Sequence, residues 1–174
     1  MLTKVYEWIL GVSEITFRPV TPDDLGTVIS FIKMLAENEG RPEVVTITEE
    51  DLAELLFGSG AIGYGYLGVK DGVPISSALL MQKYSSYRGK RVLYIEDLIV
   101  SEAARGCGVG SKMMKFLAGE ALKMGCDAME WYALKTDPKA LRFYDRLGAG
   151  LDTAHAILGF DEKSLKQAAG VMSE

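Results

Sequence analysis

The sequence predicts a mixed-sheet α/β sandwich folded as one domain. Strand-like and helix-like segments alternate along the chain, and two early strands are joined by a hairpin signal, Lys70-Asp71-Gly72-Val73. A chain of 174 residues with 48% hydrophobic composition can bury one core and is too short for two ordinary domains. We expect residues 1–13 to be an extension and residues 14–174 to form the single domain.

Capping signals mark the helix starts in the first half of the chain. Thr21 and Pro22 supply a cap and a proline at the first helical position, and Thr48 stands before three acidic residues. Gly40-Arg41-Pro42 ends the first of these two helices. The expected elements are a short helix within 1–10, a strand over 15–19, helices from 22 and from 49, and strands over 61–69 and 74–83.

The second half is organised around the strand Val92 to Val100, an apolar run that only Glu96 and Asp97 interrupt. Such a run is typical of a central strand covered on both faces. A glycine-rich turn follows and opens an amphipathic helix that Gly125 ends. The remaining expected elements are a strand over 128–134, a helix from 138 to 148 capped by Asp137, a strand over 153–160 and a helix over 161–169.

The turn Arg105-Gly106-Cys107-Gly108-Val109-Gly110 has almost no side chains on its backbone. Its N–H groups would point outward from the positive end of the helix, which suits an anion such as a pyrophosphate, and Arg105 adds a planar cation. Two known phosphate loops do not fit. A Walker loop needs Lys directly after its last glycine, and a dinucleotide fingerprint needs GxGxxG close to the strand end.

Composition excludes several functions. The formal net charge of −5 argues against general nucleic-acid binding and is compatible with cationic substrates. Two cysteines, Cys107 and Cys126, form no disulfide framework, and one histidine, His155, gives no metal-ligand cluster. We read Cys107 and His155 as packing residues. No apolar run reaches the roughly 20 residues that span a bilayer, and the start is not a convincing secretory signal. We expect a cytoplasmic protein.

Three motifs in order resemble those of the GNAT acetyltransferase superfamily. Residues 105–110 resemble its acyl-CoA pyrophosphate loop, R/Q-x-x-G-x-G/A. Residues 93–98 (LYIEDL) and 143–149 (FYDRLGA) resemble its diamine (spermidine/spermine) and thialysine acetyltransferase branch. The likeness covers roughly residues 14 to 168. It implies a GNAT-type mixed, mostly antiparallel central sheet flanked by helices, acetyl-CoA as acetyl donor with CoA as product, and a homodimer.

Acetyl transfer to an amine needs a base, a polarised thioester carbonyl and an acid for the thiolate. The resemblance makes Glu96 the base, acting through water, and Tyr144 the acid. A carboxylate that interrupts a buried strand costs free energy unless it has a role or a partner, and this cost supports a catalytic role for Glu96. The alternatives are a structural ion pair for Glu96 and core packing for Tyr144. Asp97 would face the other side of a regularly paired strand, so we read it as a binding or structural carboxylate.

The resemblance also assigns residues that would bind the two substrates. A backbone N–H in the stretch Leu98–Val100 would meet the thioester carbonyl. The residues expected to bind the cofactor are Leu98, Ile99, Val100, Arg105, Gly106, Cys107, Gly108, Val109, Gly110, Ser111 and Asp137. The residues expected to bind the amine are Glu39, Ser85, Tyr87, Glu96 and Asp97.

Two departures from the family pattern bear on these assignments. Asp137 stands where the family usually has Asn, and either residue caps a helix. Ser85 and Tyr87 stand where the polyamine enzymes would have an acidic residue and Trp, so Ser85 is closer to the thialysine-type pattern. A missing carboxylate lowers the attraction for a multiply charged polyamine.

We therefore expect direct acetyl transfer to a small primary amine: a diamine, a polyamine or a thialysine-like amino acid. The alternatives are a protein N-terminal or antibiotic acetyltransferase of the same superfamily, or a sensor that binds acyl-CoA without turnover. The presence of Glu96 and Tyr144 favours an enzyme.

Overall fold

The computed structural model describes residues 14–170, which divide into two compact units, one ending at Ala133 and the other beginning at Leu134. The first unit is built on one sheet whose strands follow the chain order β1-β2-β3-β4-β5. Neighbouring strands are antiparallel except β4 and β5, which are parallel. The predicted mixed, mostly antiparallel sheet is thereby confirmed. The strands are β1 (Thr16–Pro19), β2 (Gly63–Lys70), β3 (Val73–Ser85), β4 (Lys90–Val100) and β5 (Cys126–Trp131).

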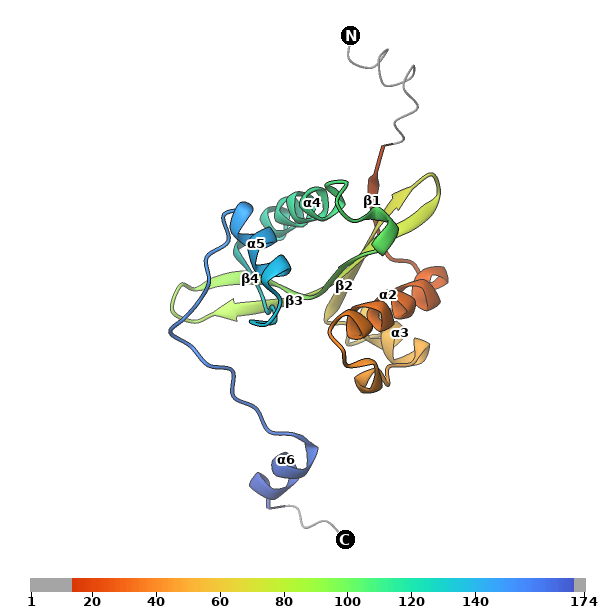
Figure 1. Cartoon of the computed structure of the whole chain (residues 1–174). Helices are drawn as coiled ribbons and strands as arrows, with labels where there is room; N and C mark the ends of the chain where they lie inside the picture. Colours follow the sequence, from red (N-terminus) through yellow and green to blue (C-terminus); the bar gives the residue numbers. More distant parts are fainter. Residues whose placement is uncertain (1–13, 171–174) are drawn as a thin grey trace, which may run out of the picture. The chain divides into compact units, whose positions relative to one another are not determined.

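Helices cover both faces of this sheet, with α2 and α3 on one side and α4 on the other (Figure 1). All three begin close to the positions that the sequence predicts. The helices of the first unit are η1 (Pro22–Asp24), α2 (Leu25–Asn38), η2 (Pro42–Val44), α3 (Glu49–Phe57), η3 (Glu102–Ala104) and α4 (Val109–Lys123). No helix among residues 14–170 is long and apolar enough to cross a bilayer.

The start of α2 is fixed by one carboxylate. Asp24 accepts two hydrogen bonds from Arg18 of β1, at 2.6 and 2.8 Å, and one from the backbone N–H of Thr21 at 2.8 Å. Thr48 and Asp51 form the equivalent capping box at the start of α3. Both boxes satisfy N–H groups that the first turn of a helix leaves without partners. The predicted caps at Thr21 and Thr48 are confirmed.

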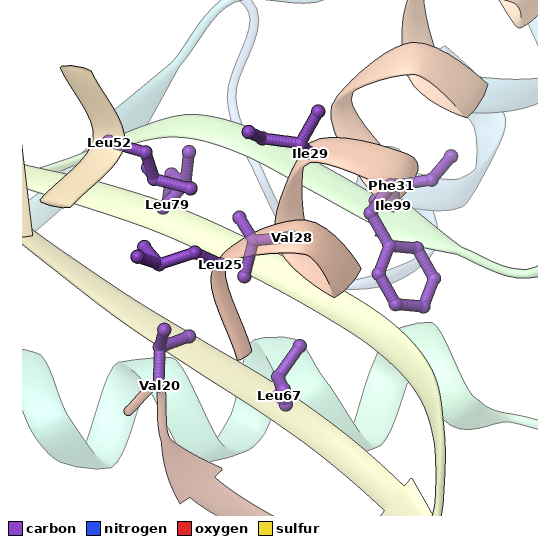
Figure 2. Packing of buried hydrophobic residues seen from close by; sticks show 9 residues of the cluster. All are labelled: Val20, Leu25, Val28, Ile29, Phe31, Leu52, Leu67, Leu79 and Ile99. Atoms are coloured by element: carbon purple, nitrogen blue, oxygen red, sulfur yellow. The ribbon is translucent and has the colours of Figure 1, made fainter. Parts of the chain in front are cut away.

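The main hydrophobic core lies between α2, α3 and the sheet (Figure 2). Leu52 of α3 and Val28 of α2 are fully buried there, against Leu67 of β2 and Leu79 of β3. Burial of one such side chain contributes about 1.5–3 kcal/mol, so this layer holds α2 and α3 on the sheet. The buried residues of this core are Val20, Leu25, Val28, Ile29, Phe31, Leu52, Leu67, Leu79 and Ile99.

The second unit contains α5 (Pro138–Arg146) and α6 (Glu162–Ala168). Asp137 caps α5 by accepting from the N–H groups of Lys139 and Ala140 at 2.9 and 3.1 Å, and Asp161 caps α6. Both helices were predicted, and the capping role of Asp137 is confirmed.

The strand predicted over 153–160 is wrong, because these residues have no strand conformation. Asp152 instead accepts hydrogen bonds from the N–H groups of Ala154 and His155 and turns the chain. Its other oxygen lies 2.6 Å from His155 Nδ1 and the histidine is exposed, so the packing role predicted for His155 is wrong as well. The apolar side chains of the segment are exposed, with 91% for Leu158. The helix predicted within residues 1–10 lies outside the described residues.

Candidate active site

The site is centred on the second half of β4, where the strand has a partner on one side only. β4 pairs with β3 up to Val100, but its pairing with β5 ends at Ile95, opposite Trp131. The backbone of residues 96–100 therefore has no strand on its β5 side within residues 14–133. One carbonyl on this stretch, that of Val100, accepts a hydrogen bond from Arg105 Nε at 3.0 Å. The predicted contact with a thioester carbonyl, from a backbone N–H of Leu98, Ile99 or Val100, would be made on this stretch.

A β-bulge lies at the centre of this stretch. Leu79 pairs with Asp97 and the next residue, Leu80, pairs with Ile95, so Glu96 is an extra residue on β4. Because cross-strand partners share a face, Asp97 lies on the face of Leu79, which is the face covered by α2 and α3. Our expectation that Asp97 faces away from Glu96 assumed regular pairing, and the bulge removes that regularity.

Three carboxylates interact at the bulge. Asp97 is half-buried, and burial, followed by the charges of Glu96 and Glu39, raises its pKa to about 6. Glu39 is the C-terminal cap residue of α2, so two different elements bring carboxylates to the same place. None of the ion pairs among residues 14–170 includes Glu39, Glu96 or Asp97. The local field is therefore strongly negative and suits a cation.

The surroundings of Glu96 differ from those that the sequence predicts. Glu96 is exposed, so the cost of burying a carboxylate applies to Asp97 and not to Glu96. The structural ion pair considered for Glu96 is also absent from the described residues. The sequence marked Asp97 as one of two adjacent carboxylates inside one apolar run, but it did not indicate which of the two is buried. A bulge that shifts one of them has no signature in composition or periodicity.

The field of these carboxylates extends along β4 to Tyr94. Burial and then the charge of Glu96 raise the pKa of the Tyr94 phenol to about 12. Its ring meets that of Tyr132 edge to face, with centroids 5.4 Å apart, and the ammonium of Lys83 lies 5.2 Å from the Tyr94 ring centroid. These aromatic contacts fix β4 against the end of β5, next to the point where the two strands stop pairing.

The glycine-rich turn follows β4 and starts α4 as predicted. Gly106 and Gly108 have φ angles of +77° and +76°, a conformation that favours glycine. Gly108 is the N-cap of α4 and gives it no side-chain cap, while Val109 is buried and anchors the first turn in the core. The N–H groups of that first turn, including those of Gly110 and Ser111, lack intrahelical partners and can bind an anion. Cys107 is exposed, so the packing role predicted for it is wrong.

The second unit carries the predicted acid, Tyr144, on α5. Its ring lies edge to face with that of Phe143, with centroids 5.0 Å apart. Burial and the charge of Asp137 raise the pKa of the Tyr144 phenol. A phenol with a raised pKa keeps its proton at neutral pH and can donate it.

Two of the predicted amine-binding residues lie far from the bulge within the first unit. Ser85 ends β3 opposite Lys90, and Tyr87 is fully exposed in the loop that follows. Ser85 is five residues along β3 from Leu80, which corresponds to about 17 Å. The structure thus brings Glu39, Glu96 and Asp97 together and does not bring Ser85 or Tyr87 to them.

The described residues thus combine a mixed, mostly antiparallel sheet, a strand that lacks a partner on one side, and a glycine turn that opens a helix, an arrangement that fits a protein binding a phosphate-bearing ligand. Residues 26–149 match the sequence model of the acetyltransferase (GNAT) family, and the chain belongs to this family. It is an N-acetyltransferase, as the resemblance implied.

Curated relatives agree with this assignment. The thialysine N-epsilon-acetyltransferase of Bos taurus is 29% identical over 143 residues, with 78% of this chain and 84% of the relative covered. The mouse (Mus musculus) enzyme of the same name is 31% identical over 140 residues, covering 76% and 82%. A spermidine/spermine N(1)-acetyltransferase-like protein of Homo sapiens is 29% identical over 139 residues, covering 76% of this chain and 20% of the relative.

Solved structures show the same fold. An integron cassette protein of V. cholerae superimposes with a TM-score of 0.73 at 27% identity, covering 89% of this chain and 97% of that protein. An aminoglycoside acetyltransferase from an uncultured soil metagenomic sample, solved with sisomicin, has a TM-score of 0.71 at 19% identity, covering 84% and 97%. The second likeness concerns the fold alone.

Proposed function

We propose that this protein transfers an acetyl group from acetyl-CoA directly to a primary amine of a small molecule. The observation that carries the proposal is that Glu39, Glu96 and Asp97 lie together at the stretch of β4 that has no partner on its β5 side. The glycine turn follows this stretch along the chain. Negative charge attracts an ammonium group, and uncapped helix amides attract a diphosphate. An enzyme with both features can hold a cationic acceptor near a CoA thioester.

Each residue then has a defined task. The amides of residues 106–111 and the guanidinium of Arg105 bind the diphosphate of CoA. A backbone N–H in the stretch Leu98–Val100 polarises the thioester carbonyl. Glu96 removes a proton from the acceptor ammonium through a water molecule, and Tyr144 donates a proton to the departing thiolate. Acetyl-CoA supplies the activated acyl group.

The acceptor that fits best carries a second charged group besides the reacting amine. Three carboxylates favour a diamine, a polyamine or an aminoalkyl amino acid of the thialysine kind. The position of Ser85 and the identity of Tyr87 weaken the case for long polyamines, because no further carboxylate is available at these two positions. The thialysine acetyltransferases among the relatives make an amino acid acceptor the first to test.

Three further expectations belong to the proposal; the homodimer rests on the family resemblance, and the location and domain organisation rest on the sequence. We propose that the enzyme works as a homodimer and in the cytoplasm. We also propose that residues 14–174 act as a single acetyltransferase domain, with residues 1–13 as an extension.

The test is CoA thiol release by the purified protein with acetyl-CoA and a panel of amines. The panel contains thialysine, lysine, ornithine, putrescine and spermidine, with an unblocked peptide N-terminus and sisomicin as acceptors of the alternative classes. Release above the amine-free rate with the small amines supports the proposal. CoA binding without release from any amine would support the sensor alternative.

Two variants test the proposed roles of Glu96 and Tyr144. Glu96→Gln is expected to lower turnover while leaving the affinity for CoA nearly unchanged, and an equal loss of both would make Glu96 structural. Tyr144→Phe is expected to slow turnover, because the phenol proton is missing, and a wild-type rate would remove Tyr144 from the mechanism. Glu50→Gln on the exposed first turn of α3 is the matched control, with no expected change.

A further inference from the structure

We infer that Glu96 and Asp97, the two adjacent carboxylates of β4, have different roles in proton transfer, and that Asp97 finally holds the proton removed from the amine. Glu96 faces solvent and exchanges the proton with a water molecule, whereas Asp97 stores it during acetyl transfer. This inference rests on the proposed function and refines it.

The bulge gives the two side chains different surroundings. As the extra residue, Glu96 is exposed, while Asp97 lies beside Leu79 on the core-facing side of the sheet. A half-buried carboxylate loses solvation when it is charged, which favours its protonated form. Regular pairing would have separated the two side chains onto opposite faces and would have given no such adjacent pair.

The charged neighbours of Asp97 act in the same direction. Among the described residues, those that act on it are Glu96 on its own strand and Glu39 at the end of α2, both negative, while β3 contributes the apolar Leu79. No described cation pairs with Asp97 to favour its charged form. The pKa of about 6 that results makes Asp97 a better proton acceptor at neutral pH than an ordinary aspartate.

The step balances without any further reactant. The acceptor enters as an ammonium, and one N–H proton passes through water and Glu96 to Asp97, which becomes a neutral acid. The amine lone pair then forms the C–N bond to the thioester carbonyl carbon, and the C–S bond breaks. The thiolate receives the proton that Tyr144 donates. As the C–S bond breaks, the nitrogen loses its second proton to solvent water and the neutral amide forms. Asp97 then releases its proton to solvent and Tyr144 takes one back, so that each turnover releases one proton.

The first test is the pH dependence of kcat/KM for acetyl transfer, measured with the whole chain. The wild-type rate is expected to rise with pH through about 6 and then level off, because Asp97 must be unprotonated to accept a proton. Asp97→Asn is expected to lose this rise and about 10²- to 10⁴-fold in rate at the plateau. Glu96→Gln is expected to be slower but to keep a rise, shifted to lower pH because one negative neighbour is gone. Glu50→Gln should match the wild type.

The inference is overturned if Asp97→Asn keeps the rise, or if Glu96→Gln abolishes it. Asp97→Glu keeps a carboxyl group, so it should recover part of the rate that Asp97→Asn loses and should again show a rise of kcat/KM with pH. If Asp97 had only a structural role, Asp97→Glu would not bring this rise back. Should the wild type release no thiol from any amine while binding CoA, the proposed function fails first, independently of this assignment.

A second test needs no turnover. Carbon-13 NMR of side-chain carboxyl groups should show one aspartate titrating near pH 6 in the wild type. This signal should be absent in Asp97→Asn and should move to lower pH in Glu39→Gln, whereas Glu50→Gln should leave it in place. If every aspartate titrates in the ordinary range, Asp97 cannot store the proton.

Discussion

Replacing Asp97 with Asn should raise the stability of the protein relative to the wild type as the pH increases from about 4 to above 6, although it removes a residue of the proposed mechanism. A rise of the Asp97 pKa from 3.8 to about 6 corresponds to about 3 kcal/mol between its charged and neutral forms. The native state then binds this proton more tightly than the unfolded chain. The free energy of unfolding of the wild type is therefore expected to fall as the pH rises from about 4 to about 6, and Asn has no such dependence.

The assay is urea unfolding of wild type and Asp97→Asn at about pH 4 and about pH 8. The stability of the variant relative to the wild type should increase by up to about 3 kcal/mol between the two pH values. The comparison between pH values removes the effect of Asn on packing, which is the same at both. A difference that stays constant over this window would show that Asp97 is not destabilised by its charge. Glu50→Gln, on an exposed turn, is the control for a general charge effect.

Three more substitutions test other parts of the structure. Asp24→Asn should lower the free energy of unfolding in urea by about 1–3 kcal/mol at pH 7, because it weakens the hydrogen bonds to Arg18. Arg18 holds the pKa of Asp24 well below its usual range, so this loss should shrink below about pH 4. A loss that does not depend on pH would contradict this reasoning. Gly108→Val should strain a φ of +76° and reduce the affinity for CoA in calorimetry, whereas Gly119→Ala, whose added Cβ meets no atom within 4 Å, should bind CoA normally. Asp137→Ala should cost about 1 kcal/mol and speed hydrogen exchange in the first turn of α5, whereas Asp137→Asn keeps the cap; equal exchange in both would argue against capping.

The sequence predicted the elements that depend on local signals. Thr48 and Asp137 cap their helices by hydrogen bonds to nearby N–H groups, so neighbours in sequence suffice to place them. The turn at Gly106 and Gly108 was likewise predictable, because a positive φ selects glycine. The mixed, mostly antiparallel character of the sheet was predicted from the family resemblance together with the hairpin signal, whereas the order of the strands was not predicted.

The predictions that were wrong concern features that depend on residues distant in sequence. The bulge that places Asp97 beside Leu79 is a property of the pairing between β3 and β4, and alternation along β4 alone cannot reveal it. The exposed position of Glu96 follows from the same bulge. The apolar pattern over 153–160 fits a strand, but a strand forms only with a partner, and Asp152 offers the backbone a turn instead.

The length of α2 links the anchor at β1 to the carboxylates of the site. Asp24 holds the start of the helix through Arg18, and Glu39 stands at its other end, beside Asp97. Fourteen helical residues span about 21 Å, and a packed helix transmits a displacement of one end to the other with little bending. A substitution at Arg18 that shifts the start of α2 would be expected to move Glu39 as well and so to change the electric field at Asp97. If the proposed amine site is right, such a change at one end of α2 would alter acceptor preference at the other.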